Sequence, residues 1–296
     1  MKEKHAKWLV GCGIGCAALV ALVVAVGFGA FYAVRDVVRN FEQVNETVSD
    51  VDKRYGEARD YTPNPDGRIP PDRIRAFLAV RSRTRPTRDE FRQTMTDIEV
   101  ASTGKGRGVG AGFRTVRSAL GVPRLLGRLY SDRASALLEN QMGFGEYLYI
   151  YSVAYYSFLR KDPGDGPENF KMSDDHTITI EGREAREAAL ETHREHAIGQ
   201  VRTLFRRFLR NAVEPAAAAE AAPEAEALPE RPPIGENLEW RQAVQKELDA
   251  LDSKWDRIPW EDGLPKQIEE SLAPYRAELE ASYDPMLNLL EFAPSH

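Results

Sequence analysis

Histidines and carboxylates lie close together in the sequence between residues 143 and 197, where such side chains could catalyse hydrolysis or bind a metal ion. His193 and His196 are three residues apart in a predicted helix, beside Glu191 and Glu195. The metalloprotease pattern His-Glu-x-x-His needs histidines four residues apart, with the glutamate between them. The observed spacing predicts a helix face with ion pairs, and we expect no metal and no cofactor. A hydrolase or metal-dependent enzyme with its site in residues 143–197 stays open as the alternative.

A glycine-rich stretch, TGKGRGVGAG, covers Thr103 to Gly112. A nucleotide-binding loop ends in Gly-Lys-Ser/Thr and follows a β-strand, because backbone N–H groups and the lysine together hold the phosphates. This stretch has neither feature, so it favours a mobile surface loop over a nucleotide site. Its two cations, Lys105 and Arg107, remain candidates for contact with an anion.

Tyrosines dominate the predicted helix at residues 143–160. Tyr147, Tyr151 and Tyr155 recur every four residues and share one face with Phe158, which is the spacing of a core stripe. Tyr149 and Tyr156 leave that stripe. We expect them to face outward, where ring stacking on a carbohydrate or peptide is the alternative to packing.

Charge is distributed unevenly along the 296 residues, whose net charge is −6. Residues 68–128 carry 14 Lys and Arg against 5 Asp and Glu, whereas residues 214–296 carry 7 against 19. Opposite charges in one chain predict that the basic block is neutralised by the acidic block, within the chain or between subunits. The other interpretations are an anionic lipid or envelope polymer and, least favoured, nucleic acid. The candidate residues for an anionic partner are Arg73, Arg75, Arg81, Arg83, Arg85, Lys105 and Arg107.

An uncharged segment of 27 residues runs from Trp8 to Val34. A transmembrane helix needs about 20 apolar residues, whereas the apolar part of a cleaved signal peptide has roughly 7–15. Cys12 follows a lipobox-like Leu-Val-Gly, but the apolar run comes after this cysteine instead of before it. The segment therefore predicts an uncleaved single-pass helix at 8–34. Three lysines within residues 1–7 place that end in the cytoplasm and the bulk of the chain outside.

The helix is expected to continue beyond the membrane as a heptad stalk at residues 35–60. Apolar residues alternate at spacings of three and four from Val37 to Tyr55, the pattern of a coiled-coil seam. The same register falls on small residues inside the membrane segment, where they let helices approach closely. The face predicts self-association, or packing of the stalk on the protein's own domain. Its residues are Gly13, Cys16, Gly27, Ala30, Val37, Phe41, Val44, Val48 and Val51.

The rest of the chain is predicted to be mostly helical. A proline-rich break at 61–71 precedes a helical domain at 72–213. Helices are predicted at 72–83, 143–160 and 183–213. A further helix is predicted to begin at a capping box formed by Thr87 and Glu90 and to end at about residue 101. Residues 113–142 predict one short and one longer helix, and the stretch HTITIEG (176–182) predicts a strand. An Ala/Pro/Glu linker at 214–236 is expected to be disordered. A C-terminal helical hairpin at 237–296 is expected to pack on the main domain through Trp240, Leu248 and Trp255.

Two short stretches of sequence resemble known proteins. KWLVGCGIGCAALVALVV resembles the N-termini of uncharacterised bacterial single-pass membrane proteins, and ALLENQMGFGEYLYI looks like a segment that follows in some of them. The resemblance implies a membrane-anchored helical protein and no particular activity. We therefore expect an all-α protein of the bacterial cell membrane with an outward domain. Its expected role is that of a scaffold or interaction protein of the envelope, and not of an enzyme.

Overall fold

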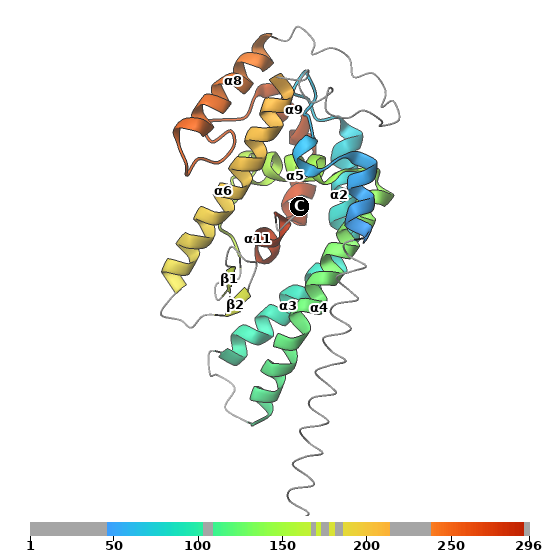
Figure 1. Cartoon of the computed structure of the whole chain (residues 1–296), viewed down its shortest axis with the longest axis vertical. Helices are drawn as coiled ribbons and strands as arrows, with labels where there is room; N and C mark the ends of the chain where they lie inside the picture. Colours follow the sequence, from blue (N-terminus) through green and yellow to red (C-terminus); the bar gives the residue numbers. More distant parts are fainter. Residues whose placement is uncertain are drawn as a thin grey trace, which may run out of the picture.

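The computed structural model describes residues 46–102, 109–166, 170–172, 178–180, 186–213 and 238–292. This part is helical except for one hairpin, in which β1 (Phe170–Met172) pairs antiparallel with β2 (Ile178–Ile180). The all-α prediction is confirmed for these residues, and β2 falls within the predicted strand (Figure 1). None of the helices described is long and apolar enough to cross a membrane. The predicted cytoplasmic segment 1–7, the predicted transmembrane segment 8–34 and the predicted face residues from Gly13 to Val44 lie outside the described residues.

Helices α2 (Pro71–Arg83) and α3 (Arg85–Ser102) follow each other with only Thr84 between them. Pro86 lacks the N–H that would bond to the carbonyl of Ser82, so the helical ladder breaks here. The predicted capping box is wrong, because α3 begins at Arg85 and the Thr87 hydroxyl donates to Asp132 instead.

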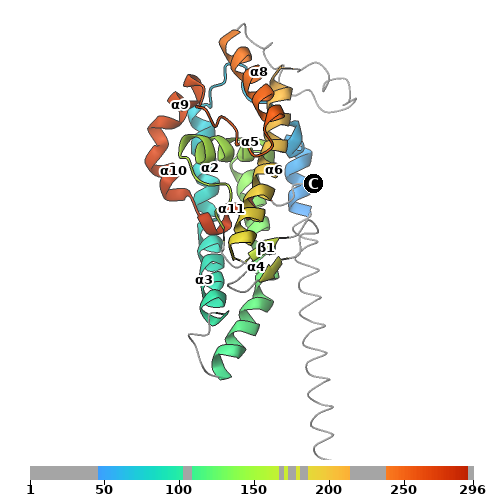
Figure 2. The same cartoon turned by 90° about the vertical axis from the view of Figure 1, so that its left-hand side faces the viewer.

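One helix, α4 (Val109–Glu139), replaces the two helices predicted over 113–142. It continues through Pro123, which costs a helix interior about 3 kcal/mol. Packing offsets this cost, since Val122, Leu125 and Leu129 are buried against Phe91 and Met95 of α3. Together, α3 and α4 form an arm at one end of the molecule (Figure 1, Figure 2).

The centre of the domain is α5 (Phe144–Tyr151), which continues into the π-helical stretch η2 (Ser152–Phe158). Fourteen of these fifteen residues are buried and the other, Glu146, is half-buried, so the helix has no solvent-exposed face. The expectation for Tyr149 and Tyr156 was therefore wrong: Tyr149 stacks on Phe205 of α6 (Arg186–Val213), and Tyr156 is buried as well. Neither ring is available to a carbohydrate or peptide.

The described part of the C-terminal segment, residues 238–292, forms four α-helices instead of the predicted two-helix hairpin. They are α8 (Leu238–Ser253), α9 (Lys266–Leu272), α10 (Arg276–Ser282) and α11 (Asn288–Glu291), with short 3-10 turns η4 (Ala273–Tyr275) and η5 (Pro285–Leu287). Helix α8 contacts α6, α9 contacts η2, and α10 lies beside α2 (Figure 2). The linker at 214–236 lies outside the described residues.

This C-terminal segment shares one core with the rest of the domain. Trp240 is 1% exposed and its ring lies over Gly67, whose φ of +72° suits a residue without a side chain. Leu248 is also buried, as expected. Trp255, by contrast, is 61% exposed because it follows the end of α8, and Trp260 is the buried tryptophan of this loop.

The predicted stalk enters the described structure at residue 46 and stays helical to residue 55. Val51 is fully buried in the protein's own core, and Val48 packs partly buried against it. At these two positions the heptad face therefore packs on the domain itself.

Candidate functional site

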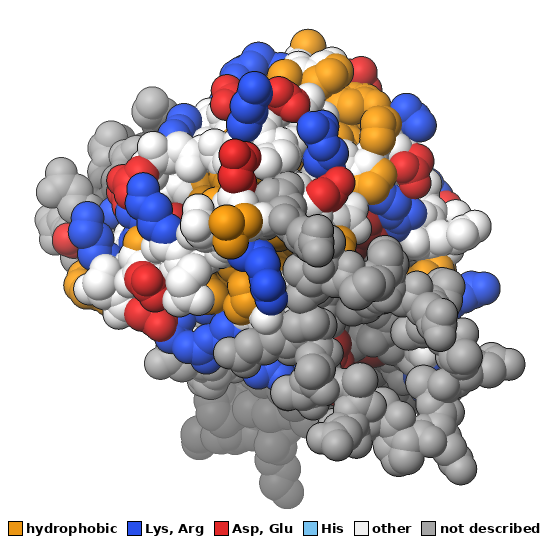
Figure 3. Space-filling view, turned by 90° about the horizontal axis from the view of Figure 1, so that it is seen from above, with side chains coloured by type: hydrophobic (Ala, Val, Ile, Leu, Met, Phe, Trp, Pro, Cys, Tyr) orange, Lys and Arg blue, Asp and Glu red, His pale blue; other side chains and the backbone are white. Residues whose placement is uncertain are grey.

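The predicted anion-binding arginines do not form one cluster. Arg73 makes a bidentate contact with Glu146 at 2.6 and 2.5 Å, and Arg75 donates to the Tyr275 hydroxyl at 3.3 Å. Arg83 and Arg85 form exposed ion pairs with Glu139 and Asp89. Lys105 and Arg107 lie outside the described residues. Seen from above, basic and acidic side chains are interleaved on the described surface (Figure 3).

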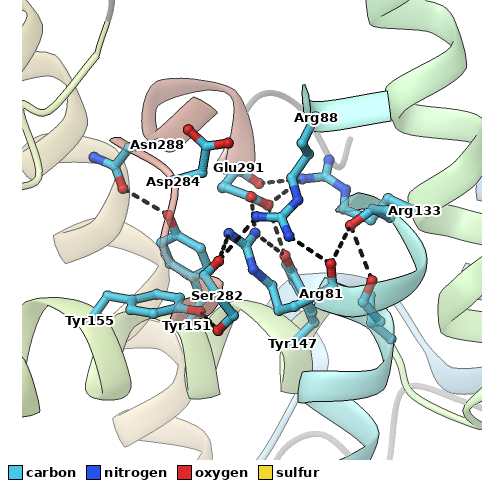
Figure 4. A network of polar contacts seen from close by, with 12 residues as sticks. Arg81, Arg88, Arg133, Tyr147, Tyr151, Tyr155, Ser282, Asp284, Asn288 and Glu291 are labelled. Atoms are coloured by element: carbon cyan, nitrogen blue, oxygen red, sulfur yellow. Dashed lines mark hydrogen bonds and ion pairs between the residues drawn. The ribbon is translucent and has the colours of Figure 1, made fainter. Parts of the chain in front are cut away.

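Arg81 differs from the others because it is completely buried. It belongs to the apolar stripe of α2 and forms an ion pair with Glu291 of α11, 210 positions further along the chain. Its guanidinium also donates to the Tyr147 hydroxyl at 3.0 Å and to the Ser282 carbonyl at 2.8 Å. The Tyr147 hydroxyl in turn donates to Glu291 at 2.9 Å, which closes a ring of polar contacts (Figure 4).

Two further buried arginines join this network. Arg133 of α4 donates to the backbone carbonyl of Glu291 at 2.9 Å and to its carboxylate at 3.1 Å. Arg88 of α3 donates to two backbone carbonyls, those of Arg81 at 2.6 Å and Ser282 at 3.0 Å. The network therefore brings three guanidinium groups around one carboxylate, and it joins α2, α3, α4, α5 and the C-terminal segment.

Two tyrosines of the central helix fix the loop beside this network. The hydroxyls of Tyr151 and Tyr156 both donate to the side-chain oxygen of Asn288, at 2.9 and 2.8 Å. The amide of Asn288 donates to the Pro163 carbonyl at 2.6 Å. These hydrogen bonds hold the C-terminal segment against the central helix and the loop at Pro163.

The electrostatics of the network do not suit acid–base catalysis near neutral pH. Burial acts to raise the pKa of Glu291, but the charges of Arg81, Arg133 and Arg88 outweigh it and lower that pKa. Burial raises the pKa of the Tyr147 hydroxyl well above its ordinary value. A general acid or base works best with a pKa near the operating pH. Glu291 and Tyr147 are shifted away from neutrality in opposite directions.

The sequence analysis listed Arg81 as a candidate for an anionic partner, whereas the structure buries it against a carboxylate of the same chain. Arg88, Arg133 and Glu291 were not singled out. The only signal for Arg81 was a charged residue at the spacing of Ile74 and Phe77. Nothing in the local sequence marks Glu291, because its partner lies more than 200 residues away.

The residues 143–197 show no metal centre where they are described. The side chains of His176 and His193 lie outside the described residues, whereas His196 lies on α6. Within the described ranges, no three His, Cys, Asp or Glu side chains are grouped as metal ligands.

A hollow with a volume of about 870 Å³ lies along α6. Arg59, beside α6, and Leu148 of α5 contribute to its lining, together with Phe292 near the C-terminus. The α6 residues that line it are His196, Gly199, Gln200, Thr203, Leu204, Arg206, Arg207 and Arg210. We call this hollow the α6 groove. It was not predicted from the sequence.

Comparison of the chain with protein-family models, with curated proteins and with solved structures gives no match. The geometry therefore defines the class of protein: a helical domain closed by a buried arginine–glutamate network, with an open basic groove on one helix.

Proposed function

We propose that this protein is a membrane-anchored scaffold or interaction protein of the bacterial envelope, and not an enzyme. The observation that carries the proposal is the role of the buried network. Its charged groups contact one another and backbone carbonyls, and they tie the C-terminal segment to α2, α3 and α4. This arrangement suits a rigid domain that binds through its surface.

The location is part of the same proposal. The segment 8–34 anchors the chain with residues 1–7 in the cytoplasm, and the helical domain lies outside the membrane. A reporter fused after residue 60 would then be active only if it works outside the cytoplasm. Activity of a reporter that works only in the cytoplasm would show that the orientation is the opposite of the proposed one.

Self-association remains proposed for the N-terminal helix alone. Its face from Gly13 to Val44 is separate from Val48 and Val51, which pack on the domain. The proposed partners are an envelope protein, an anionic lipid or polymer, or a second copy of the chain. Nucleic acid is not proposed.

Site-specific photo-crosslinking in intact cells tests the binding role. A photoreactive residue replaces Thr203, which is exposed in the α6 groove, and in a control it replaces Lys266, which is exposed on α9. The proposal predicts discrete adducts from position 203 and none from position 266. Equal labelling from both positions, or none from either, would contradict a binding role for this surface.

A further inference from the structure

The α6 groove is lined by arginines and by apolar side chains. Thr203, Arg207 and Arg210 follow the helical spacing of four and three residues, so they share one face of α6. Arg59 contributes a further cation to the lining. Leu148, Leu204 and Phe292 supply the apolar lining. A Cβ placed on Gly199 would meet nothing within 4 Å, which shows that the space above this part of the helix is open.

The charge of the groove is uneven. Four arginines line it, and no Asp or Glu is among its described lining residues. Two carboxylates nearby compensate in part: Glu57 contacts Arg59 at 2.7 Å, and Asp252 is shared by Arg206 and Arg210. No carboxylate of the described residues forms an ion pair with Arg207. The groove therefore retains more positive than negative charge, unlike the network around Glu291, where every guanidinium is held by the fold.

We infer that the α6 groove binds an anionic lipid, with its phosphate against Arg207 and Arg210 and an acyl chain along Leu148, Leu204 and Phe292. Charge complementarity favours an anion, because arginines form charge-assisted hydrogen bonds with phosphate oxygens. The apolar lining favours a lipid over a free phosphate, since it gains from covering hydrocarbon. The volume lies in the range of roughly 300–1,000 Å³ that is usual for small-molecule sites. This inference deepens the proposed function and rests on it for the nearness of a membrane.

Native mass spectrometry of the full-length protein in detergent micelles tests this inference. The protein is titrated with phosphatidylglycerol, with phosphatidylcholine as the neutral lipid and glycerol phosphate as the head group without chains. The test variant carries Arg207→Glu and Arg210→Glu, both exposed in the groove. The control variant carries Arg241→Glu, an exposed arginine of α8 outside the groove.

We expect phosphatidylglycerol to bind the wild type and the Arg241→Glu variant equally well. The double variant should bind it about tenfold or more weakly, since each arginine near an anionic lipid contributes about 1 kcal/mol, or roughly fivefold. Phosphatidylcholine should bind weakly to all three, and added salt should weaken only the phosphatidylglycerol complex.

Equal affinity of the wild type and the double variant for phosphatidylglycerol would overturn the inference. Glycerol phosphate binding as tightly as the lipid would also overturn it, in favour of a free phosphate. If crosslinking at position 203 captures a protein while these titrations show no lipid preference, the inference fails and the proposed function stands. If neither experiment detects binding, both fail.

Discussion

At the scale of residues, Glu291 is the acceptor around which the buried network is built. It is the carboxylate contacted by Arg81 and Arg133, and it receives the Tyr147 hydroxyl bond. A buried charge without a partner is far more costly than a buried pair. Removing this carboxylate would leave three buried guanidinium groups without a countercharge in the network.

Glu291→Gln should therefore lower the free energy of unfolding by about 3–5 kcal/mol. The matched control is Glu270→Gln, which breaks an exposed pair with Arg68 at 3.5 Å and should cost about 0–1 kcal/mol. Urea denaturation of the full-length protein in detergent measures both. Equal stability of the two variants would show that the network contributes no more than a surface pair.

The same residue predicts a dependence on acid. Because the folded state lowers the pKa of Glu291, its contribution to stability is fully present above the unfolded value of about 4.3. It is lost as the pH falls through the lower folded value. The stability difference between wild type and Glu291→Gln should shrink in this window. A difference that stays constant on acidification would contradict the assigned ionisation.

Some of these residues could be anticipated and others could not. The spacing of Ile74, Phe77 and Arg81 puts the arginine on the apolar face of α2, so its burial follows from helical periodicity. Its partner Glu291 belongs to a four-residue helix and is distant in sequence. Periodicity contains no information about such a pairing.

At the scale of elements, α5 approaches η1 (Ala58–Asp60) closely at Gly145. A methyl group on Gly145 would overlap the carbonyl oxygen of Ala58 and the Cβ of Tyr61, and backbone atoms cannot move aside easily. Gly199 of α6 has open space at the same position, so it offers a matched comparison.

Gly145→Ala should lower the free energy of unfolding by about 1–3 kcal/mol through overpacking. Gly199→Ala should raise it by roughly 0.5–1 kcal/mol, because alanine is the better helix former. Thermal unfolding of the two variants checks the opposite signs. A loss of stability in both would mean that the surroundings of the glycines do not decide the outcome.

The helices themselves were largely predictable, and the errors have a common cause. The predicted helix at 72–83 matches α2 to within one residue. α4 was split in the prediction, whereas packing against α3 keeps it continuous through Pro123. Tyr149 and Tyr156 were placed outward because a one-sided stripe was assumed, but α5 and η2 are surrounded on all sides. In each case tertiary packing overrode a local pattern.

At the scale of the whole molecule, two tryptophans of the C-terminal segment have opposite environments. Trp240→Ala should lower the free energy of unfolding by about 3–5 kcal/mol because it leaves a cavity at a buried position. Trp255→Ala should change stability by no more than about 0.5 kcal/mol, since that ring is 61% exposed. Chemical denaturation measures the free energy of unfolding of both variants. The sequence favoured Trp255 because it lies one helical turn after Leu251 in the apolar stripe, but α8 ends at Ser253.

The charge asymmetry was a good guide to contacts between distant segments. Arg68, Arg81 and Arg92 of the basic block pair with Glu270, Glu291 and Asp284 of the acidic block. The charge asymmetry was a poor guide to the groove. Arg207 and Arg210 belong to residues 129–213, which carry 11 Lys and Arg against 13 Asp and Glu. Arg59 and Phe292 join them only in the folded chain.

The central claim is that the arginines of α2 and α3 serve the fold, whereas those of α6 serve binding. Phosphatidylglycerol binding by two full-length double variants at low salt tests it most directly: Arg207→Glu with Arg210→Glu, and Arg83→Glu with Arg85→Glu. Each variant reverses two exposed charges, so their net charges are equal. We predict that only the α6 variant loses affinity, by about tenfold or more. Loss of binding in the Arg83 and Arg85 variant with retention in the α6 variant would contradict the account.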